Sequence, residues 1–249
     1  MLHLPADGHG DRGAADIAFV VAHGFAGSWK HARVAVILDS LAVHGGVVAV
    51  DQRGHGGSAG RTTVGHEEPI DVEAAVTWAR ELGYRRVATI GFSMGAAVAL
   101  RHAALCGRAE RAAGVDAVVS VSGPAFWYYR GTPPMRWLHR AVGNVFGRAY
   151  LRWFLRVRVN PMPWPEPPPM APTAAAAATR AEGIPLLIVH GDSDPFFPLD
   201  HPAALHAGAA GSTLWIEPGF GHAEGAISRA LVDRIAEWAR SSAAPPTDR

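Results

Sequence analysis

The chain has 249 residues, which suffice for one large α/β domain with a well-buried core and leave little room for a second domain. Its 23 Lys and Arg residues balance 22 Asp and Glu residues, and the net charge of +1 argues against a nucleic-acid partner bound through bulk electrostatics. Cys106 is the only cysteine, which excludes an internal disulfide, and the sequence lacks both a signal-peptide pattern and an apolar run of membrane-spanning length. We therefore expect a cytoplasmic protein without integral membrane association.

Short apolar segments alternate with longer amphipathic segments, a pattern typical of a mostly parallel sheet with helices on both faces. Six segments rich in β-branched residues or leucine are the candidate strands: Ile17–Ala22, Val47–Val50, Val87–Ile90, Ala117–Val121, Pro185–Val189 and Thr213–Ile216. Because they lack alternation, we expect all six to be central strands buried on both faces. The fold class predicted is α/β, with a sheet of about six to seven strands.

Apolar residues at helical spacing predict core-facing helices between the strands. Two of these apolar stripes end just before glycines, and a third lies near the end of the chain, between Glu224 and Arg240. Their members are Val34, Ile37, Leu38 and Leu41; Val72, Ala75, Val76, Ala79 and Leu82; and Ile227, Leu231, Ile235 and Trp238. Residues 242–249 are expected to be a disordered tail.

One region breaks the alternation. Residues 124–180 contain no candidate strand and divide the core into residues 1–123 and 181–241. An aromatic cluster is followed by two apolar helical patterns, by seven prolines in residues 160–172, and by an Ala-rich segment expected to be helical. We interpret this region as an inserted helical lid with a Pro-rich return, and we expect Phe126 and Trp127 to contact substrate.

The chemistry starts at Ser93, the centre of Gly91-Phe92-Ser93-Met94-Gly95 between a predicted strand and an Ala-rich helix. A sharp strand-to-helix turn presents a serine hydroxyl above a sheet, and the residues two before and two after it must be small. By accident this five-residue pattern would occur in roughly one such chain in seven. The predicted strand before it and the predicted helix after it are therefore the main evidence that the motif is functional. Ser93 is the predicted nucleophile.

A serine hydroxyl needs a neighbouring base, and a carboxylate followed by a histidine stands downstream in the order this architecture uses. Asp194 follows the strand ending at Val189, and His222 follows the last strand in a Gly-rich loop. Asp192 lies two residues before Asp194, so one of these two carboxylates orients His222 while the other braces the loop. We assign the orienting role to Asp194 and expect Phe196, in the same loop, to contact substrate.

Charge that develops on a substrate carbonyl oxygen needs backbone N–H donors. Met94, directly after the nucleophile, supplies one donor, and Phe25, in the Gly-rich loop after the first predicted strand, supplies the other. His23 and His55 sit beside glycines in turns, where an imidazole more often fixes a loop than reacts. The predicted oxyanion hole is therefore Phe25 and Met94.

Together, these motifs resemble the α/β-hydrolase superfamily of esterases, lipases and thioesterases from about Ile17 to Arg240. The matching segments are His23-Gly24-Phe25, Asp51–Ser58, Gly91–Gly95, Gly191 to Pro198 and Gly221-His222. The resemblance implies triad roles for Ser93, Asp194 and His222, an oxyanion hole at Phe25 and Met94, and a buttressing turn at Asp51–Ser58. Only about sixteen residues precede the first predicted strand, so we expect the family's opening antiparallel strand pair to be shortened or missing.

The reaction itself stays open at this point. The first hypothesis is hydrolysis of a small carboxylic ester or thioester through an acyl-enzyme on Ser93. The same triad could serve amide or carbon–carbon cleavage, lyase or acyl-transfer chemistry, and a ligand-binding protein on a hydrolase scaffold is the alternative of another class. The thirteen histidines form no Cys/His or HExxH pattern, so we expect neither a metal nor a cofactor. The sequence does not predict the oligomeric state.

The predicted lid is locally basic. Seven arginines and no Asp or Glu lie between Ala117 and Pro165. Arg148, Arg152 and Arg156 recur every fourth residue and would form one stripe on a helix, leaving Tyr150, Leu151, Phe154 and Leu155 for its packed side. This stripe is either a solvated face or an attractor for an anionic substrate, an acidic carrier protein or a membrane surface.

Overall fold

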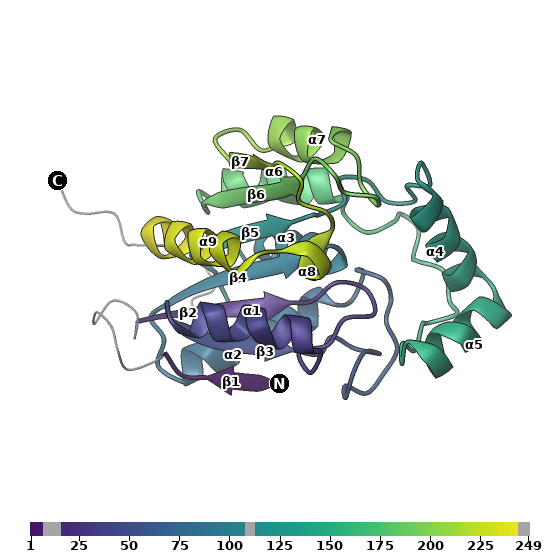
Figure 1. Cartoon of the computed structure of the whole chain (residues 1–249), viewed down its shortest axis with the longest axis horizontal. Coiled ribbons are helices and arrows are strands. Elements are labelled where there is room, and N and C mark those ends of the chain that lie inside the picture. Colours follow the sequence, from purple (N-terminus) through teal and green to yellow (C-terminus); the bar gives the residue numbers. More distant parts are fainter. Residues whose placement is uncertain (7–15, 108–112, 244–249) are drawn as a thin grey trace.

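A single mostly parallel sheet forms the centre of the molecule. The computed structural model describes residues 1–6, 16–107 and 113–243. Within them, seven strands are arranged in the order β1-β3-β2-β4-β5-β6-β7, and only β1 runs antiparallel to its neighbour (Figure 1). Their bounds are β1 Leu2–Leu4, β2 Ile17–Ala22, β3 Gly46–Val50, β4 Arg86–Phe92, β5 Ala117–Val121, β6 Leu186–Gly191 and β7 Thr213–Glu217.

The sequence predicted six of these strands and missed β1. This three-residue strand pairs Leu2 with Ala49 and Leu4 with Val47. It is too short to show an alternation of its own, so the pairing partner on β3 defines it. At the other edge, β7 has no fully buried residue, and the prediction that all six strands are central is wrong for β7.

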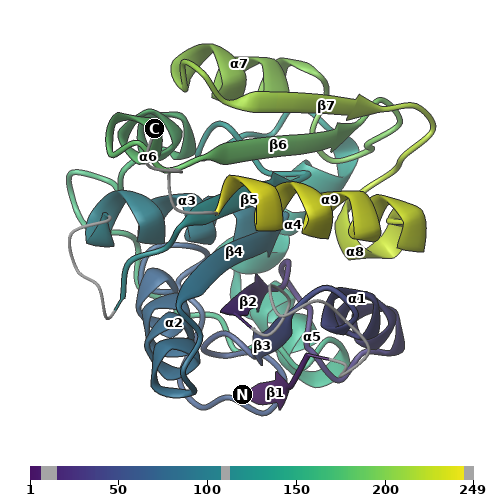
Figure 2. The same cartoon turned by 90° about the vertical axis from the view of Figure 1, so that its left-hand side faces the viewer.

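Helices cover both faces of the sheet because side chains alternate along each strand (Figure 2). Along β2, Ile17, Phe19 and Val21 pack on one helical layer, whereas Ala18 and Val20 pack on the other. The first layer consists of α1 Ala32–Ala42, α8 Ala223–Ala226 and α9 Arg229–Ser242; the second consists of α2 Pro69–Glu81, α3 Met94–Cys106, α6 Pro172–Ala181 and α7 Asp200–Gly208.

The carboxyl-terminal helix differs from its prediction at both ends. The segment from Glu224 to Arg240 is divided into α8 and α9, and the Ser228 hydroxyl caps α9 by accepting a hydrogen bond from the Leu231 N–H. Helix α9 extends to Ser242 and is followed by the buried Ala243, so the predicted disordered tail is wrong for these two residues. Residues 244–249 of that tail lie outside the described residues. Leu82, assigned to the buried stripe of the second helix, is 41% exposed because α2 ends before it.

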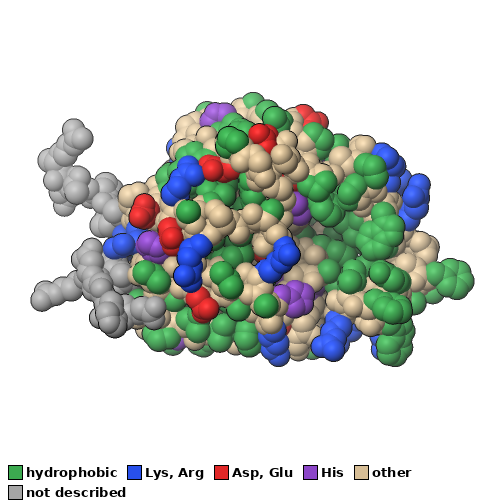
Figure 3. All heavy atoms as spheres, viewed as in Figure 1, with side chains coloured by type: hydrophobic (Ala, Val, Ile, Leu, Met, Phe, Trp, Pro, Cys, Tyr) green, Lys and Arg blue, Asp and Glu red, His purple; other side chains and the backbone are tan. Residues whose placement is uncertain are grey.

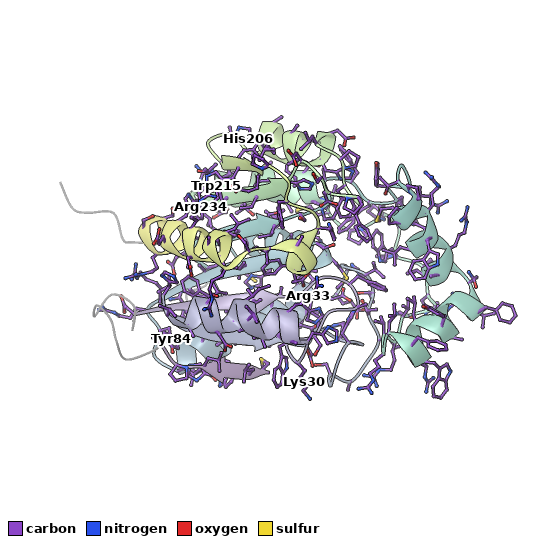
Figure 4. The ribbon with its side chains drawn as sticks, viewed as in Figure 1. Lys30, Arg33, Tyr84, His206, Trp215 and Arg234 are labelled. Atoms are coloured by element: carbon purple, nitrogen blue, oxygen red, sulfur yellow. The ribbon has the colours of Figure 1, made fainter. Side chains whose placement is uncertain are left out.

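An ion pair and a ring contact attach α9 to the edge strand. Arg234 lies 4.8 Å from the centre of the Trp215 ring on β7 and pairs with Glu217 at 2.9 Å (Figure 4). These contacts cover one side of the half-exposed strand. They help to place the loop after β7, which carries His222.

The segment between β5 and β6 holds α4 Pro133–Gly143, α5 Val145–Phe154 and α6. Helices α4 and α5 stand beyond the carboxyl ends of the parallel strands (Figure 1). Asn144 separates them and caps α5 by accepting a hydrogen bond from the Gly147 N–H. Helix α6, which the sequence analysis included in the insertion, buries Ala175 and Ala176 in the layer of α3 and therefore belongs to the covering of the sheet.

Candidate active site

Ser93 occupies the turn between β4 and α3. Its φ of 51° is in the left-handed region, and its N–H donates to the Val121 carbonyl oxygen at 2.9 Å. A Cβ at Gly91 would overlap the Gly95 carbonyl group, and a Cβ at Gly95 would overlap the Ala22 carbonyl group. Backbone sterics therefore require both glycines, and the turn raises the serine above the carboxyl end of the sheet.

Three side chains from three strand ends form one chain of hydrogen bonds. His222 Nε2 lies 2.9 Å from Ser93 Oγ, and His222 Nδ1 lies 2.7 Å from Asp194 Oδ2. The His222 side chain is 15% exposed and that of Asp194 is fully buried. The structure thus brings together the three residues that the sequence selected as a triad, with one imidazole nitrogen facing the hydroxyl and the other facing the carboxylate.

The loop after β6 separates the roles of the two neighbouring aspartates. Asp194 Oδ1 accepts hydrogen bonds from the Phe196 and Phe197 N–H groups at 2.8 and 3.1 Å. Burial raises the pKa of the Asp194 carboxyl, but the hydrogen bond from His222 and these N–H groups outweigh it and hold the pKa below its usual value. Asp192 instead accepts the Gly219 N–H at 2.7 Å and braces the turn before His222.

Aromatic rings fix the orientation of the histidine. The Phe196 ring stacks on His222 at 4.3 Å, and the Phe197 ring meets it edge-on at 5.6 Å. Behind Asp194 the buried His190 ring hydrogen-bonds the Phe197 carbonyl oxygen at 2.8 Å and approaches Asp194 Oδ2 at 3.5 Å. The histidine and its carboxylate are therefore held from both sides.

The loop after β2 faces Ser93. Phe25 and Met94, the predicted oxyanion donors, line the same cavity as Ser93, and no hydrogen bond from either N–H to another described residue is found. A turn closed by the Gly27 N–H and the Gly24 carbonyl oxygen, at 2.9 Å, shapes the loop. The Gly24 N–H is engaged separately, because it donates to Glu224 Oε1 at 2.6 Å.

His23 holds this loop from below. Its Nδ1 donates to the Gly24 carbonyl oxygen at 2.8 Å, and its Nε2 accepts the Gln52 N–H at 3.1 Å, a pattern that one neutral tautomer satisfies. Burial, and to a smaller extent the neighbouring His55 ring, lowers the pKa of His23 to about 4. His23 and His55 are both buried, which agrees with the prediction that they fix the loops and do not react.

A cavity of about 560 Å³ opens over Ser93. Phe126, Trp127 and Phe196, the three predicted substrate contacts, all line it. Further walls that the sequence analysis missed come from the loop after β3, from α4 and from the Pro-rich segment: Thr62, Val64, Met135, Leu138, Val142 and Trp164. Glu224 was missed too, because its partner Gly24 lies 200 residues away and no local pattern relates them.

The predicted arginine stripe does not form as expected. Helix α5 ends at Phe154, so Arg156 lies beyond it, and Arg148 turns inward to donate to the Val142 carbonyl oxygen at 3.1 Å. The expected packed side is also wrong. Leu151 is fully buried, but Tyr150 is 45% and Phe154 74% exposed.

Neither a metal-ligating cluster nor a membrane-spanning helix is found among the described residues. No group of three or more His, Cys, Asp or Glu side chains in this part of the chain is arranged to hold a metal ion. None of the helices in the same residues has the length and apolar character needed to cross a membrane.

Comparisons with known proteins agree with this architecture. The chain is similar in structure to Est1E from Butyrivibrio proteoclasticus, solved with ferulic acid bound, at 17% identity over 96% of this chain and 92% of that one, with a TM-score of 0.59. It is also similar to an esterase from Pyrococcus furiosus at 21% identity over 91% and 79%, with a TM-score of 0.62. An α/β serine hydrolase without a lid from Xanthomonas campestris matches at 19% identity over 99% and 89%, with a TM-score of 0.60.

At these identities the structural likeness shows the fold. A search of curated proteins found no significant match. The model of the alpha/beta hydrolase family matches residues 19–241, which include the turn at Ser93, the loop of Asp194 and His222. This match spans most of the sequence and agrees with the sheet order and its helical layers, and the chain therefore belongs to the alpha/beta hydrolase family.

Proposed function

We propose that this hydrolase cleaves carboxylic esters or thioesters through an acyl-enzyme on Ser93. The observation that carries the proposal is the unbroken hydrogen-bond chain from Ser93 Oγ through His222 to Asp194 at the floor of the cavity. A serine hydroxyl in this setting can lose its proton to a positioned imidazole as it attacks.

In the proposed reaction, Ser93 Oγ attacks the carbonyl carbon while His222 Nε2 takes its proton. The carbonyl oxygen becomes an oxyanion facing the N–H groups of Phe25 and Met94. Collapse of this intermediate expels the alcohol or thiol, which receives the proton from His222. Water then attacks the acyl-enzyme and gives a proton to His222. The bond between Ser93 Oγ and the acyl carbon breaks, His222 returns the proton to Ser93, and the carboxylic acid leaves. Asp194 keeps the imidazole in the tautomer that both steps need.

The residues that line the cavity favour a neutral, apolar acyl or aryl group as the part of the substrate that binds beside Ser93. Among the described residues that line it, Glu224 is the only carboxylate and there is no Lys or Arg. Burying an anionic group there would cost free energy without a cationic partner. An anionic leaving group or an acidic carrier protein would have to lie outside, near the arginines of α4 and α5.

A panel of chromogenic esters and thioesters of graded acyl length, run beside fluorophosphonate labelling, tests the proposal. Turnover and labelling are expected for the natural chain, and Ser93→Ala should abolish labelling and lower turnover by about three to six orders of magnitude. A variant that keeps a tenth of the activity would place the nucleophile elsewhere. If the natural chain shows neither turnover nor labelling, the proposal is wrong, and a ligand-binding role takes its place.

A further inference from the structure

Helix α5 turns an apolar stripe toward solvent. Five of its residues stand at the i, i+3, i+4, i+7 and i+8 spacing by which a surface helix normally faces the core. These are Phe146, Ala149, Tyr150, Trp153 and Phe154, and all are exposed. Phe146 is 84% exposed, and Trp153 and Phe154 are each 74% exposed, whereas Leu151 is the one buried residue of the helix. The described residues leave this stripe uncovered.

Cationic side chains surround the stripe. Exposed arginines lie on α4, on α5 and just after α5, namely Arg136, Arg140, Arg152 and Arg156. The Arg152 guanidinium lies 5.5 Å from the centre of the Trp153 ring. With no Asp or Glu between positions 117 and 165, the segment that contains α4 and α5 carries charges of one sign. Figure 3 shows apolar side chains gathered at the end of the molecule formed by α4 and α5, with basic side chains around them.

The charge and the position of the stripe indicate which kind of partner binds to it. In a symmetric dimer the same patch meets itself, so arginines would face arginines, and like charges placed together are unfavourable. Helices α4 and α5 protrude from the body of the molecule (Figure 1) and can reach a flat surface without obstruction. Exposed Trp, Tyr and Phe beside arginines are the composition of segments that lie in a membrane interface.

We propose that the outward stripe of α5 docks the protein on an anionic lipid membrane. Phe146, Trp153 and Phe154 enter the boundary between headgroups and acyl chains, and the surrounding arginines pair with lipid phosphates and other anionic headgroups. The attachment is peripheral, and it does not depend on turnover at Ser93.

Docking in this way would bring the cavity mouth close to the lipid. Trp137 and Leu155, which line the cavity, are themselves 48% and 38% exposed. Trp137 contacts Tyr150 at 6.0 Å between ring centres, and Tyr150 stacks on Phe154 at 5.0 Å. An apolar path therefore leads from the stripe to the cavity, and, if the proposed ester hydrolysis holds, it suits substrates that partition into membranes.

Co-sedimentation with vesicles of phosphatidylcholine, with and without phosphatidylglycerol, tests the docking. The natural chain should bind the vesicles that contain phosphatidylglycerol. The triple variant Phe146→Ser, Trp153→Ser and Phe154→Ser should bind them at least about tenfold more weakly. The matched control Val36→Ser, Ile70→Ser and Leu105→Ser removes side chains that are 53%, 57% and 60% exposed elsewhere, and it should bind like the natural chain.

A second set separates charge from apolar contact. Replacing Arg140, Arg152 and Arg156 by Gln should weaken binding to anionic vesicles by about fivefold per arginine and flatten its salt dependence. Both triple variants should keep the turnover of a short soluble ester, since none of these residues lines the cavity. Two results would overturn the proposal: a natural chain that ignores anionic vesicles, or an aromatic variant that binds them as tightly as the natural chain does. A dimer in ultracentrifugation that the aromatic variant abolishes, without vesicle binding, would assign the stripe to a second copy.

Discussion

The Glu224 carboxylate accepts a hydrogen bond of 2.6 Å from the Gly24 N–H, and so connects the short helix after His222 to the loop that carries Phe25. A Cβ at Gly24 would lie 3.2 Å from both Glu224 Oε2 and the Ser93 Cβ, so the three residues are closely packed. Because Phe25 follows Gly24 directly, the hydrogen bond helps to fix where the Phe25 N–H points. We regard Glu224 as a positioning residue of the proposed oxyanion hole.

Glu224→Ala should therefore lower kcat by about tenfold to a hundredfold with little change in KM. The reason is that a displaced Phe25 N–H would mainly weaken the hydrogen bond to the oxyanion, which forms in the transition state. Glu224→Gln retains an oxygen acceptor and should recover most of that loss. Steady-state kinetics on one chromogenic ester measure both variants. Equal losses in the two variants would show that the charge of Glu224, and not its hydrogen bond, is what matters.

The two aspartates after β6 should differ sharply in their effect on activity. Asp194→Asn keeps an oxygen for the Phe196 and Phe197 N–H groups but places an NH2 donor opposite His222 Nδ1. The imidazole is then held in the wrong tautomer, which should cost about 10⁴ in kcat. Asp192→Asn changes only the brace to the Gly219 N–H and should cost less than about tenfold. The ranking is read from kcat of the two purified variants, and the reverse ranking would transfer the orienting role to Asp192.

Buried histidines make folding stability depend on pH. Burial lowers the pKa of both His23 and His102 to about 4, from the value of 6.5 that is usual for histidine. Between these two values the unfolded chain binds protons that the folded chain does not, so stability is full above about pH 6.5 and is lost as the pH falls toward 4. Each histidine contributes on the order of 3 kcal/mol to this loss. Denaturant unfolding at several pH values measures it.

His102→Leu gives the matched test. Neither ring nitrogen of His102 has a hydrogen-bond partner among the described residues, and leucine is of similar size. The variant should match the natural chain at pH 7 within about 1.5 kcal/mol and lose less stability on acidification. If His102→Leu follows the same acid curve as the natural chain, His102 does not titrate in this range.

The cavity should determine which acyl groups are accepted. Val142 lies on α4 in the cavity wall, and Val142→Trp would fill part of its volume of about 560 Å³. Long-chain esters should lose at least about tenfold in kcat/KM, since even one misfitted methylene group costs 1 kcal/mol or more. An acetyl ester should be hydrolysed as before and serves as the internal control. A uniform loss over all chain lengths would indicate a displaced α4 instead.

The local parts of the site could be predicted from sequence because backbone sterics are local. Gly91 is required by atoms of Gly95 and Ala96 within the same turn, and the strand before Ser93 and the helix after it each carry their own apolar pattern. Gly95 is required by the Ala22 carbonyl group at the end of β2, but the motif that contains both glycines is itself local. Chain order then led to the loops of Asp194 and His222. The choice of Asp194 over Asp192, by contrast, depends on which of the two carboxylates contacts the His222 ring, and His222 comes from the loop after β7.

The remaining features are decided by contacts between segments far apart in the chain. Strand β1 exists because β3 offers an edge, and Glu224 enters the site because α8 brings it beside Gly24. Helix α5 shows the same limit: its apolar spacing predicts a helix and a packed face, but the spacing does not say what covers that face. Short-range sterics and periodicity are encoded in the sequence, and they sufficed to predict six strands, the turn at Ser93 and the three side chains of the proposed triad. Which surfaces are buried could not be predicted in this way, because burial depends on contacts with segments that are distant in the sequence.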